Sequence, residues 1–198
     1  MLLFCRQVNP NRERAKQNAR LLKKNCLVIS IAKGLDEAAK TGAKIFNDVL
    51  ERHQLYGLLY GARISEESRT RRYAFAQLGC DDVDSYNRIR SLFHGTHLYI
   101  EHTSDITGIS WSVILKNVCA VVFGMADELQ LGDNMRGYLS VVALRELGQI
   151  VGKMGGQTGS PYHLAGLGDL ITTATSEDSH HHELGRMLAR GEVNGIEG

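Results

Sequence analysis

The chain has 198 residues, of which 43% are hydrophobic and 23% charged, so it can bury the core of one large or two small domains. Its 23 Lys and Arg nearly balance 22 Asp and Glu, and the net charge of +1 gives no reason to expect nucleic acid or an anionic membrane as partner. With no unbroken run of 18 apolar residues, and only a short apolar start, we expect neither a membrane span nor a signal peptide. The four cysteines are widely spaced and form no C-x-x-C pair, as is typical of thiols in a reducing, cytoplasmic compartment.

Short apolar segments alternate with polar helical segments in the first half. Asn9-Pro10-Asn11 breaks the chain before the first helix, and Gly34 ends the second strand. We predict strands near residues 1–5, 26–32, 58–60, 73–76 and 98–101, and helices over about 13–24 and 40–53. This alternation predicts a mostly parallel α/β sheet.

After Asp105 the pattern changes to helices alone, over residues 111–129, 134–153 and a last segment after Ser179. We therefore predict two domains, an incomplete α/β domain over residues 1–105 and an α-helical domain over residues 106–198. A glycine-rich stretch from Gly155 to Asp169 precedes the last helix, and its turns allow close approach of the backbone to a ligand. Asp169 is either a functional carboxylate in that loop or a helix N-cap.

One lysine, Lys116, lies inside the apolar segment 111–129. Apolar residues recur there at helical spacing, and we interpret them as a buried face: Trp111, Ile114, Leu115, Val118, Val121, Val122 and Met125. No Asp or Glu stands within four residues of Lys116, so burial should lower its pKa toward the range where a lysine exchanges protons at neutral pH. The alternative is that its side chain extends to the surface and keeps its charge in water.

Several blocks occur in an order that is recognisable. They are Ile31-Ala32-Lys33-Gly34-Leu35-Asp36, Asp105-Ile106-Thr107-Gly108, Leu115-Lys116-Asn117-Val118, Leu131-Gly132-Asp133-Asn134 and Gly166-Leu167-Gly168-Asp169-Leu170-Ile171-Thr172-Thr173. Together they resemble the NAD(P)-dependent glycerol-3-phosphate dehydrogenases over nearly the whole chain. The resemblance implies the C-terminal part of a Rossmann-like NAD(P)-binding domain in residues 1–105. It further implies that residues 106–198 form a helical substrate-binding and dimerisation domain of the 6-phosphogluconate-dehydrogenase-like type, in a cytoplasmic homodimer.

The reaction that the resemblance implies is reversible hydride transfer between NAD or NADP and C2 of sn-glycerol 3-phosphate, giving dihydroxyacetone phosphate for phospholipid biosynthesis. The implied catalytic residues are Lys116 as proton acceptor and donor, Lys33 and Asp169. The implied substrate-binding residues are Lys33, Gly61, Lys116, Asn117, Asp169, Thr173, Ser179, His180 and His181. The implied cofactor-binding residues are Lys33, Ser65, His180 and Glu197, and no metal is expected. Two lysines near one oxygen would depress each other's pKa and stabilise a developing alkoxide.

Three features depart from the family pattern. The chain has no G-x-G-x-x-G turn, which in the family holds the cofactor pyrophosphate, so we expect weak dinucleotide binding. Ser179-His180-His181-His182 stands where the family has S-R-N-R, and a histidine of ordinary pKa is mostly neutral at pH 7. Tyr60-Gly61-Ala62-Arg63 replaces the start of S-G-P-[ST]-F-A. Two alternatives stay open: a non-catalytic truncated descendant with a binding or regulatory role, and a related dehydrogenase for another 2-hydroxy acid.

Overall fold

A computed structural model of the chain describes residues 2–4, 11–19, 21–22, 26–50, 55–62, 72–175 and 179–193. Its strands are β1 (Leu2–Phe4), β2 (Leu27–Ser30), β3 (Leu55–Tyr60), β4 (Ala74–Gly79) and β5 (Leu98–Thr103). Its α-helices are α1 (Asn11–Ala19), α2 (Gly42–Val49), α4 (Val83–Leu92), α5 (Ile106–Glu128), α6 (Gly132–Lys153), α7 (Asp169–Thr175) and α8 (His180–Ala189). A short 3₁₀-helix, η1 (Ser160–Tyr162), and a π-helix, η2 (Leu164–Gly168), lead into α7.

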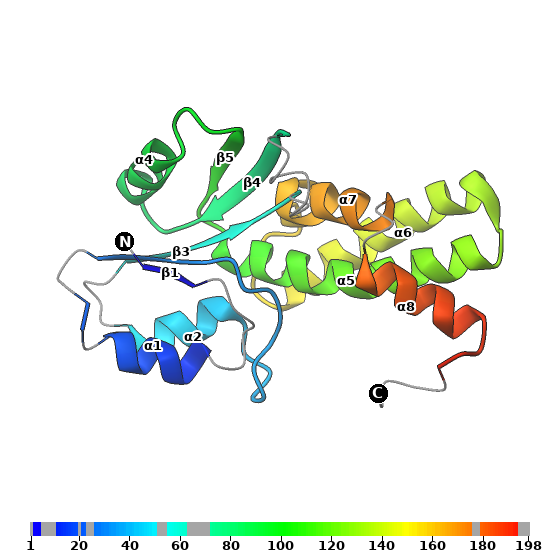
Figure 1. Cartoon of the computed structure of the whole chain (residues 1–198), viewed down its shortest axis with the longest axis horizontal. Coiled ribbons are helices and arrows are strands. Elements are labelled where there is room, and N and C mark those ends of the chain that lie inside the picture. Colours follow the sequence, from blue (N-terminus) through cyan, green and yellow to red (C-terminus); the bar gives the residue numbers. More distant parts are fainter. Residues whose placement is uncertain are drawn as a thin grey trace.

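The strands form one sheet in the order β1-β2-β3-β4-β5, in which only the β3/β4 pairing is antiparallel among the described strands. Helices α1 and α2 lie on one side of this sheet and α4 on the other (Figure 1). The predicted α/β fold and mostly parallel sheet are therefore confirmed, and every predicted strand falls on an observed one. Helix α4 was not predicted, because its sequence buries only Ser85 and Ile89 and shows little apolar periodicity.

Each face of the sheet carries its own apolar core. Val28, Leu58 and Tyr60 point toward α2 and the start of α5, while Ile29, Leu78 and Ile89 belong to the core under α4. Side chains of successive residues alternate between the faces of a strand, and helices cover both faces, so the inner strands β2 and β3 are mostly apolar, whereas the edge strand β5 carries Glu101 and His102.

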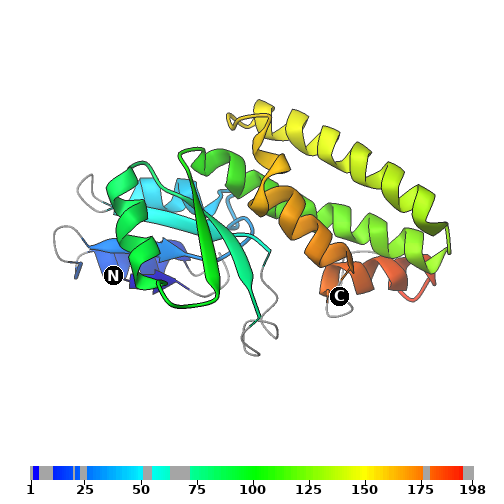
Figure 2. The same ribbon diagram turned by 90° about the horizontal axis from the view of Figure 1, so that it is seen from above.

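Helix α5 runs from the sheet to the far end of the molecule, with α6, α7 and α8 packed along it (Figures 1 and 2). Although it contains no unbroken apolar run of membrane length, it is long and apolar enough to cross a membrane by length and composition alone. Half of its most apolar window is buried inside the protein. The core helix of a soluble protein passes the same test of length and composition. The change from strands to helices falls between Thr103 and Ile106, and the division into two domains there stays a prediction.

None of the seven positions predicted to be buried on α5 is fully buried: Trp111, Ile114, Leu115 and Val121 are half-buried, and in the second half of the helix the prediction is wrong. Val118, Val122 and Met125 are 64%, 43% and 37% exposed. The buried positions there are mostly smaller residues or lie on the opposite side, namely Lys116, Ala120, Phe123, Gly124 and Ala126. The physical reason is that α8 packs against the small residues of α5, and a glycine lets two helix backbones approach where a larger side chain would hold them apart.

Candidate functional site

Two lysines and a carboxylate meet where the sheet joins the helices. Lys33 follows β2, Lys116 lies near the middle of α5, and Asp169 is the first residue of α7. Strands β2 and β3 are parallel, with Ser30 opposite Leu58, so their carboxyl ends form one edge of the sheet. In open α/β sheets that edge is where ligands bind.

Local contacts fix the backbone just before Lys33. The buried hydroxyl of Tyr60 donates to the carbonyl oxygen of Ala32 at 2.7 Å, and the amide of Ala32 donates to Ser30 Oγ at 3.2 Å. Gly61 follows Tyr60 with a φ of +151°, and a Cβ there would collide with the backbone of Phe75. The ends of β2 and β3 are thus held rigidly, and glycine is required at position 61, directly after β3.

Asp169 joins the two lysines through one oxygen atom. Lys33 Nζ donates to Asp169 Oδ2 at 2.6 Å, and Lys116 Nζ lies 3.3 Å from the same oxygen. Lys116 also donates to Thr173 Oγ1 at 2.5 Å, and that hydroxyl donates to the carbonyl oxygen of Asp169 at 2.7 Å. The side chains of Lys116 and Asp169 are 5% exposed and that of Lys33 is 28% exposed, so Lys33 forms the outer side of this cluster.

Burial lowers the pKa of Lys116 to about 8. The charge of Asp169 and its hydrogen bond act in the opposite direction, and Lys33 adds to the lowering. Desolvation therefore outweighs the attraction of the carboxylate. The sequence-based expectation of a buried lysine with a lowered pKa is confirmed, although its partner belongs to α7, far along the chain, and could not be found from neighbours in the sequence.

The histidine-rich start of α8 lies near this cluster. Ser179 caps the helix by accepting from the amide of His182 at 3.3 Å, and His180 is exposed. The pKa of His181 is lowered by its partial burial, then by the charges of Lys116, His180 and Lys33. His181 is exposed, and it lies close enough to Lys116 and Lys33 for their charges to act on its imidazole.

The remaining predicted site residues fall into two groups. Asn117 follows Lys116 on α5 and is half-buried, about 100° further around the helix. Ser65 and Glu197, predicted at the cofactor, and Arg63 lie outside the described residues. The structure brings together Lys33, Lys116, Asp169, Thr173 and His181, and the catalytic and binding roles of all these residues stay predictions.

The glycine-rich stretch has a structural partner that the sequence did not suggest. Asp105 caps α5 by accepting from the amide of Gly108 at 2.9 Å, and its other oxygen accepts from the Gln157 amide at 2.8 Å and from Ser160 Oγ at 2.5 Å. These bonds hold the loop after α6 against the start of α5. That loop leads into η1, then η2 and then Asp169. A π-helix such as η2 is frequent next to functional sites.

The family model that matches this chain describes the NAD-dependent glycerol-3-phosphate dehydrogenase C-terminus, and it covers residues 105–197. The glycerol-3-phosphate dehydrogenase [NAD(P)+] 1 of Mycobacterium tuberculosis is 34% identical over 165 residues, which are 83% of this chain and 48% of that protein. The corresponding enzyme of an Exiguobacterium species is 29% identical over 183 residues, 90% of this chain and 53% of that protein. This chain thus spans about half the length of the curated relatives it matches.

Among solved structures, the glycerol-3-phosphate dehydrogenase of Coxiella burnetii superposes with a TM-score of 0.87 at 23% identity, over 96% of this chain and 58% of that one. The enzyme of Dunaliella salina gives a TM-score of 0.82 at 21% identity, over 99% of this chain and 34% of that one. At such identities the likeness establishes the fold, a partial Rossmann-like sheet followed by a helical domain.

Proposed function

We propose that the chain carries the substrate side of an oxidoreductase, because residues 105–197 match the family model of the NAD-dependent glycerol-3-phosphate dehydrogenase C-terminus. The reaction is the reversible conversion of sn-glycerol 3-phosphate into dihydroxyacetone phosphate. The observation that supports it most is Lys116, a buried lysine with a pKa of about 8 held by Thr173 and Asp169.

Lys116 moves the proton in this proposal. In the oxidation direction its neutral amine accepts the proton of the C2 hydroxyl as the hydride leaves C2, and in the reverse direction its ammonium returns that proton. A pKa near the working pH keeps both protonation states available, as general acid–base catalysis requires. Lys33 orients the reacting oxygen, because its ammonium has three N–H donors and the Asp169 oxygen takes one.

The phosphate of the substrate lies, in this proposal, at the outer side of the cluster. We assign Gly61, Asn117, Ser179, His180 and His181 to that end, together with Lys33. His181 supports the assignment, because burial and then the charges of Lys116, His180 and Lys33 lower its pKa, which indicates that both lysines lie near it. A dianion there would be attracted by the lysine charges that repel a protonated His181.

The chain fits only part of a nicotinamide site. The rigid ends of β2 and β3, with Lys33 and Gly61, lie at the carboxyl edge of the parallel strands, where the nicotinamide end of NAD or NADP would bind and accept the hydride from C2. The sequence has no G-x-G-x-x-G turn to hold a pyrophosphate. We therefore assign Lys33, and by sequence Ser65, His180 and Glu197, to that end of the cofactor and derive no further contact.

Calorimetric titration of this chain with glycerol 3-phosphate tests the substrate site. We expect saturable binding, with glycerol bound at least tenfold more weakly because it lacks the phosphate, and Lys33→Met should weaken glycerol 3-phosphate binding by a similar factor. Lys153→Met is the matched control, since Lys153 is an exposed lysine at the end of α6. Equal binding of glycerol and glycerol 3-phosphate would contradict the proposal and favour a descendant without this activity.

We also infer that two copies associate through the helical domain. Val118, Val122, Met125 and Leu129 are exposed and repeat at spacings of four, three and four residues on α5. That is the spacing of the contact seam between two packed helices.

The described cysteines, Cys26, Cys80 and Cys119, are free thiols, which supports the cytoplasm as location.

A further inference from the structure

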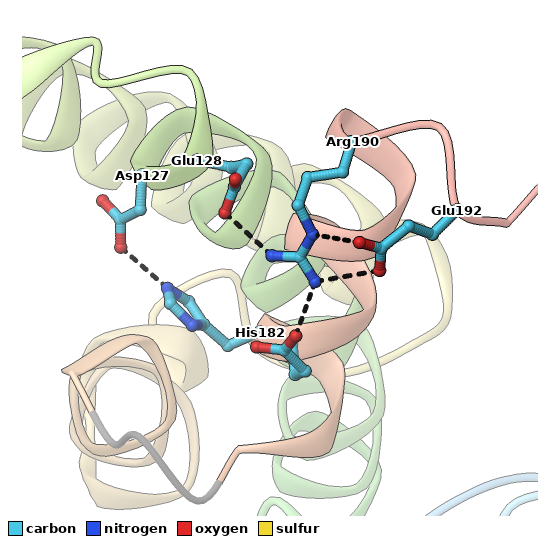
Figure 3. Close-up of polar contacts among 6 residues, drawn as sticks. Asp127, Glu128, His182, Arg190 and Glu192 are labelled. Carbon is cyan, nitrogen blue, oxygen red and sulfur yellow. Dashed lines mark hydrogen bonds and ion pairs between the residues drawn. The ribbon is translucent and has the colours of Figure 1, made fainter.

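The far end of α5 carries a carboxylate that joins three helices. Asp127 Oδ1 accepts from Arg136 Nη2 of α6 at 2.6 Å. Asp127 Oδ2 lies 2.7 Å from His182 Nε2 of α8 (Figure 3). Burial acts to raise the pKa of Asp127, but the hydrogen bonds from Arg136 and His182 outweigh it and lower the pKa. Because an ionised carboxylate only accepts hydrogen bonds, His182 Nε2 carries the proton in this contact.

Helix α8 is in backbone contact with α5 next to this pair. A Cβ on Gly124 would collide with the carbonyl oxygen of His182, and a Cβ on Gly185 would collide with that of Val121. A second tie lies at the other end of α8, where Arg190 donates to Glu128 at 3.0 Å and to Glu192 at 2.8 Å (Figure 3). The position of the first turn of α8 is thus fixed by close packing and by the 8%-exposed His182.

That first turn also carries His181, the histidine beside the lysine cluster. We propose that Asp127 and His182 are positioning residues: they hold the first turn of α8 on α5 so that His181 faces Lys33 and Lys116, and they thereby set the affinity of the site for an anion. The hold of Asp127 and His182 on the first turn of α8 stands on the contacts above, whereas the orientation of His181 and the anion affinity rest on the proposed function. No sequence pattern pointed to Asp127, which lies on α5 about three turns beyond Lys116.

Asp127→Asn removes the pairing without changing the size of the side chain. An amide has one acceptor oxygen where the carboxylate has two, so the substituted side chain cannot accept from Arg136 and His182 through separate oxygens. In the unaltered chain the pKa of His181 is lowered by burial and by the charges of Lys116, His180 and Lys33. We expect NMR titration of the His181 imidazole, assigned with His181→Gln, to give a higher pKa in Asp127→Asn, because the imidazole moves away from the lysines.

Glu128→Gln is the matched control, since Glu128 neighbours Asp127 and ties α8 through Arg190 rather than through His182. It should leave the His181 titration within about 0.2 pH units, a margin of about 0.3 kcal/mol. His182→Arg, which keeps an N–H donor that can reach Asp127, should preserve the wild-type titration, and His182→Leu should reproduce the Asp127→Asn result. If Asp127→Asn does not fold, His182→Leu gives the same readout with the Asp127–Arg136 pair intact.

Titration with inorganic phosphate completes the experiment. We expect Asp127→Asn to bind phosphate at least fivefold more weakly than the unaltered chain and Glu128→Gln to bind it equally well. A His181 pKa that stays the same in Asp127→Asn and His182→Leu would overturn the positioning role. Absence of phosphate binding in the unaltered chain, with the His181 shift observed, would leave positioning established and contradict the anion site of the proposed function.

Discussion

Burial and the carboxylate of Asp169 act on the pKa of Lys116 in opposite directions. The pKa falls from 10.5 to about 8, so desolvation is the larger effect even with a carboxylate oxygen at 3.3 Å. Asp169 does not cancel it because the same oxygen is already shared with Lys33 at 2.6 Å. The result is a lysine that is held in place by Asp169 and Thr173 and can still release its proton near neutral pH.

Replacing Lys116 with methionine should change the pH dependence of stability. Below about pH 8 the folded chain carries a charge that burial disfavours, and the unfolded chain keeps that proton up to about pH 10.5, so the stability of the unaltered chain rises with pH between these values. The shift corresponds to at most about 3 kcal/mol. Lys116→Met should therefore be as stable or more stable at pH 7, and this advantage should shrink by pH 10 in urea unfolding. A variant that is much less stable at both pH values would mark Lys116 as structural.

Anion binding should strengthen in two steps as the pH falls. Lys116 gains its proton near pH 8, and His181, whose pKa is lowered, gains its proton only below its ordinary range near 6.5. Each added charge should tighten binding about fivefold, or about 1 kcal/mol. Sulfate is the suitable probe, since its charge is constant over this range. Lys116→Met should remove the step near pH 8, and His181→Gln should remove the lower step. If both variants lose the same step, the two groups do not act separately on the anion.

Helices α5 and α8 are packed closely because glycines occupy the crossing. Gly124 faces the carbonyl oxygen of His182, and Gly185 faces that of Val121. The cost of a glycine in a helix interior, about 0.5–1 kcal/mol relative to alanine, is accepted at positions where a methyl group has no room. This packing also explains why Val118, Val122 and Met125 lie on the exposed side of α5.

Gly124→Ala should destabilise the protein by about 2 kcal/mol or more, because backbone atoms cannot move aside as a flexible side chain can. Gly137→Ala is the matched control: Gly137 lies within α6 with nothing within 4 Å of an added Cβ, so the change should stabilise by about 0.5–1 kcal/mol. Thermal unfolding of both variants measures the difference. A Gly124→Ala variant as stable as the control would show that α8 does not pack in this way.

At the scale of the whole molecule, an apolar stripe on α5 is exposed along the helical half. Val122 stands in its middle, between Val118 and Met125. Sedimentation analysis should give a dimer for the unaltered chain and a monomer for Val122→Glu, because a charge in the seam would be buried without a partner. Val83→Glu, at a valine at the start of α4 that is 57% exposed against 43% for Val122, should remain a dimer. A monomer in the unaltered chain would refute association through this stripe.

The sequence by itself determined the local features of this protein. Apolar alternation and helical periodicity located the strands and the long helices, and the position of Lys116 within an apolar segment predicted its lowered pKa, because each depends on residues close together in the chain. Helix α4 and the short helix α7 were missed, since neither has enough apolar periodicity to be distinguished from a loop.

Only the tertiary structure decided which groups meet. Lys33 reaches Asp169 across 136 residues, Lys116 reaches Thr173 across 57, and Asp127 reaches His182 across 55. Periodicity likewise showed that α5 has an apolar face, but which face is buried depends on where α8 can approach, and the glycines at Gly124 and Gly185 decide that. Sequence patterns depend on residues that are close along the chain, whereas burial and ion pairing depend on residues that are close in space.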